Sequence, residues 1–156
     1  MRTKMDSKDL QILSILQKNG RIPISELSSQ LNMSDTPCLR RVKKLEKAGV
    51  ISSYCAQLDP SSVGLNAIIY VFITLRKNTI ANADDFEKAV NSLEQVTECC
   101  VITGKHDYLL KIIAPDLLNY ERFVKKSLGS LSCIGSIESS VVLKQTFSNR
   151  LLPLSL

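Results

Sequence analysis

The sequence predicts an α+β protein of two domains, the first helical and the second built from alternating strands and helices. Before Gly49 the apolar residues recur at helical spacing, whereas from Ala67 onward strand-length apolar runs alternate with helical stripes. The turn-forming segment Asp59-Pro60-Ser61-Ser62 separates the two patterns. We therefore expect one domain over residues 1–60 and a second over residues 61–156.

The composition is that of a soluble globular protein. The chain has 156 residues, of which 44% are hydrophobic and 22% charged, and this length allows two small domains with a core each. No apolar run approaches the roughly 20 residues that a helix needs to cross a bilayer. The polar start, Met1 to Asp6, lacks the apolar stretch of a signal peptide. We expect a cytoplasmic protein with no membrane association.

The positive charge is concentrated in the first domain. Residues 1–60 hold ten Lys and Arg against six Asp and Glu, a balance of +4, whereas residues 61–156 hold ten against nine, a balance of +1. A basic segment beside a nearly neutral one indicates that the first domain binds a polyanion and that the second has another role.

The cysteines do not form a metal-binding pattern. Their number is odd, no C-x-x-C pair occurs, and His106 is the only histidine. We expect no metal site and no cofactor. Small, buried, reduced thiols are the expected role for all five: Cys38, Cys55, Cys99, Cys100 and Cys133.

Three helices are predicted in the first domain. A helix from Asp6 to Lys18 ends at Asn19-Gly20, and Pro23 suits the first turn of a second, short helix. The turn Asn32-Met33-Ser34 follows, because Asn tolerates a left-handed conformation and Ser is a good N-cap. The third helix is expected from about Asp35 to Ala48, with Gly49 ending it.

The segment Val50–Leu58 mixes β-branched, aromatic and polar residues at strand length. After three helices, it is interpreted as the strand pair or wing of a winged helix. The first domain is thus predicted to be a winged helix-turn-helix, with the helix-turn-helix over about residues 24–43.

The second domain follows the order βαββαβ. That order predicts a four-stranded antiparallel sheet with two helices on one face, a ferredoxin-like sandwich. Two helices cannot cover both faces, so we expect a second subunit to cover the other and the protein to form a homodimer. The elements are strands 67–75, 96–103, 108–113 and 134–145, a helix carrying Phe86 to Leu93 with Asn82 as its cap, and a helix from Pro115-Asp116 to Leu128.

The third helix has the features of a DNA recognition helix. A projection at 100° per residue places Cys38, Val42 and Leu45 on the core side and a basic arc of roughly 100° opposite them. Arg41 lies at the edge of that arc, either as a phosphate contact or as a packing residue. Ser34 and the free amides at the helix start can hold a phosphate. The predicted DNA-binding residues are Ser34, Thr36, Arg40, Arg41, Lys43, Lys44 and Lys47.

A charged outer face on an amphipathic helix is more often simply solvated. The neighbouring features favour DNA binding instead, because two short helices and a tight turn precede this helix and a wing-like segment follows it.

Three separate segments carry a resemblance to a known family. The segments are LSSQLNMSDTPCLRRVKKL (residues 27–45, continuing to Ile51), TGKHDYLL (103–110) and SNRL (148–151). They resemble the feast/famine regulators, the leucine-responsive and asparagine-responsive (Lrp/AsnC) family. The resemblance covers essentially the whole chain. It implies DNA-binding transcriptional regulators whose C-terminal sandwiches pair into dimers, which commonly assemble into rings of four dimers, an octamer.

The resemblance also implies an effector, usually an amino acid, bound near the interface between dimers. Gly104 would let a backbone approach the ligand, and Asp107 would accept from an α-amino group. The alternatives are that Gly104 serves only the turn, that Asp107 bonds to its own loop and that the serines face solvent. The matching positions are Gly104, Lys105, His106, Asp107, Ser139 and Ser140.

Effector binding that changed how dimers meet would change the spacing of the helix-turn-helix pairs.

Two alternative functions can be tested against the sequence. Siroheme decarboxylases resemble the same fold, but they need paired His and Arg groups, whereas His106 is alone and is expected to be a surface hairpin residue. A scaffold with a degenerate helix-turn-helix would not need a basic arc. We therefore expect a regulator and not an enzyme.

Overall fold

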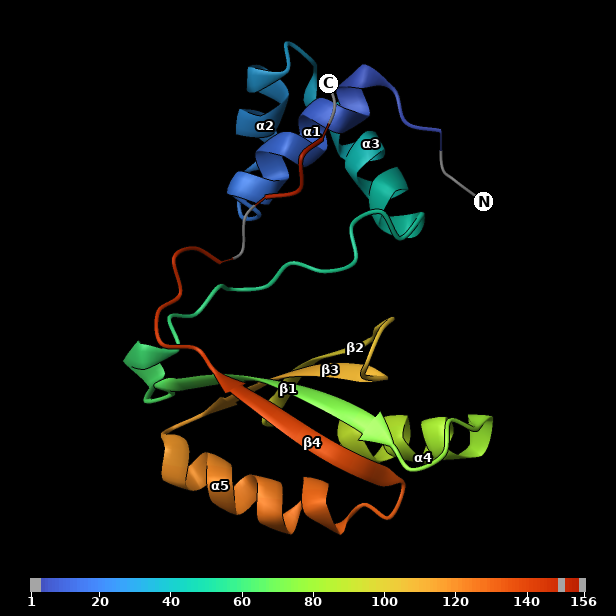
Figure 1. Cartoon of the computed structure of the whole chain (residues 1–156). Helices are drawn as coiled ribbons and strands as arrows, with labels where there is room; N and C mark the ends of the chain where they lie inside the picture. The colour runs from blue at the N-terminus through green and yellow to red at the C-terminus, as the bar shows by residue number, and fades with distance from the viewer. Residues whose placement is uncertain (1–3, 149–150, 155–156) are drawn as a thin grey trace. The chain divides into compact units, whose positions relative to one another are not determined.

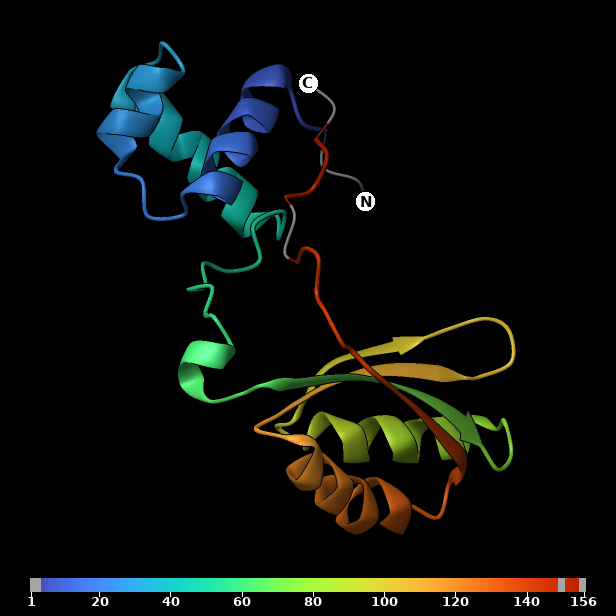
Figure 2. The ribbon, with the colours of Figure 1, turned by 60° about the vertical axis from the view of Figure 1, so that its left-hand side comes forward.

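The computed structural model describes residues 4–148 and 151–154, which form two compact units. The first unit contains the described residues up to Gln57 together with those from Phe147 onward, and the second runs from Leu58 to Thr146. The expected boundary at Pro60 differs little from this one. The expected second domain includes residues 147–156, whereas the described residues from Phe147 onward group with the first unit (Figures 1 and 2).

Three helices make up most of the first unit. Helix α1 (Ser7–Lys18) begins at a capping box in which Asp6 accepts from the backbone of Asp9 and Asp9 accepts from that of Asp6. Helix α2 (Ile24–Gln30) follows Pro23, which is its N-cap and not its first helical residue. Helix α3 (Asp35–Lys47) ends in Ala48 and Gly49, whose φ of 69° is the left-handed conformation expected of a helix stop.

The three helices enclose one apolar core. Ile12 of α1, Leu27 of α2, and Cys38 and Leu45 of α3 are all 0% exposed. Because each helix contributes an apolar stripe and the charges lie outside it, burial of these stripes stabilises the unit more than helix propensity does.

The predicted wing strand is absent. Residues 50–59 carry no strand, and the four strands of the described part of the chain all lie between Ala67 and Val141. An isolated strand leaves its backbone groups unpaired, so composition alone cannot form one. Tyr54 instead donates a hydrogen bond to Glu46 Oε1 at 3.0 Å, which ties this segment to the end of α3.

The second unit is the predicted βαββαβ sandwich. Its strands are β1 (Ala67–Leu75), β2 (Val96–Val101), β3 (Tyr108–Ala114) and β4 (Ile134–Val141), paired antiparallel in the order β2-β3-β1-β4. Helices α4 (Ile80–Asn91) and α5 (Leu117–Lys126) cover one face (Figure 1). Short 3₁₀ turns lie at Ser61–Val63 and Leu128–Ser130.

Element ends differ from expectation where capping decides them. Helix α4 is capped by Thr79, whose hydroxyl accepts from the backbone of Asn82, so the predicted cap, Asn82, lies inside the helix. Strand β2 ends at Val101, before Thr103, and β4 ends at Val141, before Gln145.

The sheet has one covered face and one open face. Along β1 the residues alternate strictly between buried and half-buried, from Ala67 to Leu75. The buried set, which includes Ile69, Val71 and Ile73 at 0% exposure, packs against the helices with Phe86 of α4. The half-buried set, including Tyr70 and Phe72, forms the open face. Its apolar character is unusual for a surface that water alone covers.

Among the described residues, no helix is both long and apolar enough to cross a membrane.

Candidate functional site

The turn between α2 and α3 sets the direction of α3. Asn32 takes the left-handed conformation with φ 50°, as expected. The Ser28 hydroxyl, which is buried, donates to the Asp35 carboxylate in the first turn of α3. Lys8 of α1 donates to the Leu31 carbonyl at 2.7 Å, so a C-terminal carbonyl that α2 leaves free is satisfied. The three helices are therefore joined by polar contacts as well as by the core.

The outer face of α3 is exposed and basic. Arg40, Lys43 and Lys47 are exposed, as are Thr36 and the N-cap Ser34. Among the residues that the structure describes, none forms an ion pair or side-chain hydrogen bond with Arg40, Lys43 or Lys47. Ser34 makes no side-chain cap bond, which leaves its hydroxyl accessible. We name Arg40, Lys43 and Lys47 the outer cations of α3.

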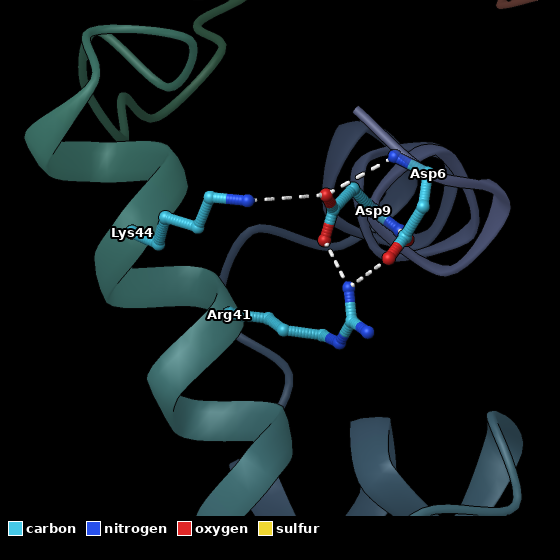
Figure 3. Close-up of polar contacts among 4 residues, drawn as sticks. All are labelled: Asp6, Asp9, Arg41 and Lys44. Atoms are coloured by element: carbon cyan, nitrogen blue, oxygen red, sulfur yellow. Dashed lines mark hydrogen bonds and ion pairs between the residues drawn. The ribbon is translucent and has the colours of Figure 1, made fainter. Parts of the chain in front are cut away.

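Arg41 has carboxylate partners on α1. Its Nη1 atom donates to Asp6 Oδ2 at 2.6 Å and to Asp9 Oδ1 at 2.7 Å (Figure 3). Asp9 is 1% exposed, so its charge is desolvated and needs these partners. The hydrogen bond from Arg41 holds the pKa of Asp6 below its ordinary value, and the same contacts raise the pKa of Arg41.

Lys44 lies on the same side of the helix as Arg41. Its Nζ atom is 3.8 Å from Asp9 Oδ2, although the side chain is 55% exposed (Figure 3). The predicted basic arc is thus divided, with three outer cations facing solvent and two cations, Arg41 and Lys44, directed to Asp9. We name Asp6, Asp9, Arg41 and Lys44 the Asp9 network. The sequence feature that indicates this network is the position of Asp9. It precedes Ile12 by three residues and Leu13 by four, and both are buried.

The hairpin between β2 and β3 holds the first group of predicted effector residues. Gly104 has φ 116°, a backbone conformation that is strained for any residue with a side chain. A Cβ at this position would nevertheless meet no atom within 4 Å. Asp107 is already engaged: Oδ2 accepts from the Leu75 backbone at 2.8 Å and Oδ1 from Asn78 at 3.2 Å. These bonds attach the hairpin to the end of β1. They differ from both predicted roles of Asp107, which were to accept from an α-amino group or to bond within its own loop.

Lys105 and His106 meet Glu138 of β4. The Lys105 Nζ and the His106 Nε2 each lie 3.5 Å from Glu138 Oε2. His106 Nδ1 is 3.2 Å from Thr74 Oγ1, and its ring lies 5.2 Å from that of Phe72 on the open face. The expected surface position of His106 is therefore wrong, since its side chain is only 14% exposed. The sequence did not indicate Glu138 as a residue of this site.

Ser139 and Ser140 lie on opposite faces of the sheet. Ser139 is in register with Val71 and its hydroxyl is 2.5 Å from that of Tyr120, on the helix-covered face. Ser140 is in register with Tyr70 and shares the open face. Adjacent strand residues point in opposite directions, so the two serines cannot line one pocket within a single chain.

A groove of about 660 Å³ lies between α4 and the edge strand β2. Glu87 at its wall accepts from the Tyr108 hydroxyl at 2.8 Å, and burial together with that carboxylate raises the pKa of Tyr108 to about 12. Cys99 lines the same groove, and partial desolvation there raises the pKa of its thiol. Local sequence patterns do not predict this groove, because α4 and β2 form it jointly.

The expectation that all five cysteines are buried is wrong. Cys38 and Cys133 are buried, whereas Cys55, Cys99 and Cys100 are exposed and all five are free thiols. Cys99 and Cys100 lie on an edge strand and Cys55 in the segment without regular structure, and neither location offers a core. The described residues contain no cluster of three or more His, Cys, Asp or Glu residues that could hold a metal ion.

Comparisons with known proteins agree with this architecture. Residues 5–52 match the winged helix-turn-helix DNA-binding family, and residues 68–152 match the Lrp/AsnC ligand binding domain. The leucine-responsive regulatory protein of Escherichia coli K12 is 38% identical over 148 residues, which cover 94% of this chain and 90% of that protein.

Two solved structures share the whole fold. A transcriptional regulator from Neisseria meningitidis in complex with L-Met superposes with a TM-score of 0.92, 37% identity and 97% coverage of both chains. An AsnC family transcriptional regulator from Agrobacterium tumefaciens has a TM-score of 0.91 and 32% identity, covering 96% of this chain and 97% of its own. The protein described here therefore belongs to the Lrp/AsnC family: it is a transcription regulator with a helix-turn-helix DNA-binding domain and a ligand-binding domain, and not an enzyme.

Proposed function

We propose that this regulator binds double-stranded DNA in the cytoplasm with the outer cations of α3 in the major groove. The observation that supports this most directly is that Arg40, Lys43 and Lys47 are exposed and carry no carboxylate partner among the described residues. Cations without intramolecular partners are available for guanine edges and phosphates, and Thr36 adds a hydroxyl on the same face. Ser34 and the first amides of α3 provide a further phosphate contact.

DNA binding is tested by fluorescence anisotropy with a duplex from the protein's own upstream region. Replacing Arg40 and Lys43 together by Ala is expected to weaken binding by about a hundredfold, because each contact contributes roughly 1–3 kcal/mol. The matched control replaces Arg122 and Lys126 on α5 by Ala, which removes the same charge from another exposed helix. Equal losses in the two double variants would reduce the effect to net charge and overturn the proposal.

We further propose that an amino acid is the effector and that it binds beside the hairpin 104–107. Lys105 and Glu138 are 81% and 57% exposed and lie 3.5 Å apart, so their opposite charges complement the carboxylate and ammonium groups of a zwitterion. A Cβ at Gly104 would meet no atom within 4 Å, so a ligand backbone has open space there. His106 adds an apolar ring edge and a donor, Ser140 lies on the same face, and Asp107 holds the loop in place. Ser139, bound to Tyr120, is given no role in this site.

The L-Met complex of the Neisseria meningitidis regulator makes L-methionine the first probe for this site. A thermal-shift screen over the amino acids, starting with L-methionine and L-leucine, is expected to raise the Tm for at least one. Glu138→Gln should abolish that shift, whereas Glu121→Gln should keep it, because Glu121 is a similarly exposed member of an ion pair on α5. A flat screen would contradict the amino-acid proposal without bearing on DNA binding.

The open face of the sheet is the surface proposed for dimerisation. Ile68, Tyr70, Phe72, Leu109 and Ile113 make it apolar, and all are half-buried in the isolated chain. We propose a homodimer through this face and an octamer of four dimers, as in the family that the chain resembles. Light scattering after size-exclusion chromatography tests this, since Tyr70→Asp places a charge in the face and should yield monomers. A monomeric wild-type protein would overturn it.

A further inference from the structure

The C-terminal segment is packed on the DNA-binding unit. Strand β4 ends at Val141, and the chain then continues to Phe147, where it joins the first unit. Figures 1 and 2 both show the last described residues running beside α1. We name the described residues 147–148 and 151–154 the tail.

One side chain of α1 holds the tail by its backbone. The Gln17 Oε1 atom accepts from the Leu152 backbone amide at 2.7 Å, and Gln17 Nε2 donates to the Leu152 carbonyl at 3.4 Å. A single amide therefore satisfies both polar groups of one tail residue, as a neighbouring strand would. Two residues on, Leu154 packs against the apolar core that includes Ile12. The tail thus makes a polar contact at Leu152 and an apolar contact at Leu154.

Two leucines of the tail are exposed. Leu152 is 72% exposed and Leu151 is 46% exposed, so their side chains contribute little burial. At Leu152 and Leu154 the described contact consists of two hydrogen bonds and one half-buried leucine. Each such interaction contributes only modestly in water. A ligand that binds the protein better with the tail released than with the tail docked, or the reverse, can supply a free energy as modest as that of these contacts.

Helix α1 also carries the acids that position the recognition helix. Asp6 and Asp9 begin this helix and bind Arg41 of α3, while Gln17 near its other end binds the tail. A change in the seating of α1 would therefore reach α3 through contacts that are already formed.

We propose that the tail is a strap that stabilises α1 in the DNA-binding unit and gives the ligand-binding unit a second connection to the recognition helix, through the contacts of the tail with α1. The first route is the chain from α3 through Leu58 to β1, and the second is the return of the chain from β4 to α1. The regulatory part of this inference rests on the proposed DNA binding. The structural part, the docking of the tail on α1, does not.

The test uses the full chain and three point variants. Gln17→Ala removes the side chain of the clamp, and Leu152→Pro removes the amide that donates to it. Gln11→Ala is the matched control, because Gln11 lies on the same helix and its side chain forms no hydrogen bond among the described residues. Alanine is the better helix former, so a loss in Gln17→Ala does not come from propensity. Truncation after Thr146 is less informative because it also removes Arg150.

The first measurement is hydrogen exchange of the α1 backbone amides. Gln17→Ala and Leu152→Pro are expected to speed exchange in the second half of α1 about tenfold, while Gln11→Ala leaves it unchanged. Leu152→Ala should also leave it unchanged, since the clamp uses only the Leu152 backbone. Unchanged exchange in Leu152→Pro, or equal acceleration in Leu152→Ala, would overturn the strap.

The second measurement is DNA affinity at several salt concentrations. The two clamp variants are expected to bind the upstream duplex about threefold to tenfold more weakly, with an unchanged salt slope because no cation is lost. Normal affinity together with faster exchange would overturn the route to the recognition helix and leave the docking of the tail. If the wild-type chain fails to bind DNA, the proposed function fails, and hydrogen exchange still decides whether the tail docks on α1.

Discussion

Two groups of cations on the same helix differ in what surrounds them. The outer cations, Arg40, Lys43 and Lys47, face solvent, whereas Arg41 and Lys44 are directed to the nearly fully buried Asp9 of α1. One group is available for a polyanion and the other is used within the fold. If α3 binds DNA as proposed, a count of its basic residues overstates its DNA contacts, because the partners of each cation decide its role.

The largest expected effect comes from removing the acid that holds the inner group. Asp9→Ala leaves Arg41 without its buried partner and also breaks the capping box of α1. Breaking a buried pair from one side typically costs about 3–5 kcal/mol, and the 30% exposure of Arg41 reduces this to about 2–3 kcal/mol. Urea unfolding of the full chain measures it. A stability equal to that of wild type would show that the Asp9 network does not support the fold.

A smaller effect separates two adjacent lysines. Lys43→Ala removes an outer cation and should weaken DNA binding by about tenfold, or roughly 1.4 kcal/mol. Lys44→Ala removes a cation that Asp9 already attracts, so its loss should be clearly smaller, at about threefold or less. The two variants are controls for each other because both lysines are exposed and adjacent. A larger loss for Lys44 would place that residue among the DNA contacts.

The smallest effect is a pH dependence from Asp6. Its pKa is lower in the folded chain than the ordinary 3.8, mainly because Arg41 donates to it. Its stabilising contribution is therefore present above pH 3.8 and is lost as the pH falls through the lower, folded-state pKa. Asp6→Asn keeps an N-cap and removes the charge. Thermal unfolding should show a higher Tm for wild type than for the variant at pH 6 and a gap that narrows as the pH falls below 3.8, while a constant gap would contradict the ion pair.

Much of the fold could be predicted because local patterns determine it. The boundaries of β1 follow from an uninterrupted apolar run between turn residues, and the ends of α3 follow from Asn32 and Gly49, both of which adopt positive φ. The absence of the predicted wing strand could not be foreseen, since a strand at residues 50–58 requires a partner strand and composition does not reveal whether one exists. The return of the tail to α1 depends on Gln17 and Leu152, which are far apart in sequence.

The candidate sites show the same division. The helical projection located the outer cations because a helix fixes the angle of every side chain. It left Arg41 unresolved because Asp6 and Asp9, which decide its role, lie on another helix. On β4, the family resemblance implied that Ser139 and Ser140 share a site, whereas the alternation of a strand places them on opposite faces. Contacts between elements, and not patterns within them, carry the missing information.

A salt titration of DNA binding by Arg40→Ala and Arg41→Ala tests the central comparison most directly. If only the outer cations contact DNA, Arg40→Ala should lower both the affinity and, where it contacts a phosphate, the salt slope by about one. Arg41→Ala should lower the stability of the first unit and weaken DNA binding without changing the slope. A fall in slope for Arg41→Ala, with none for Arg40→Ala, would contradict the assignment of the two groups.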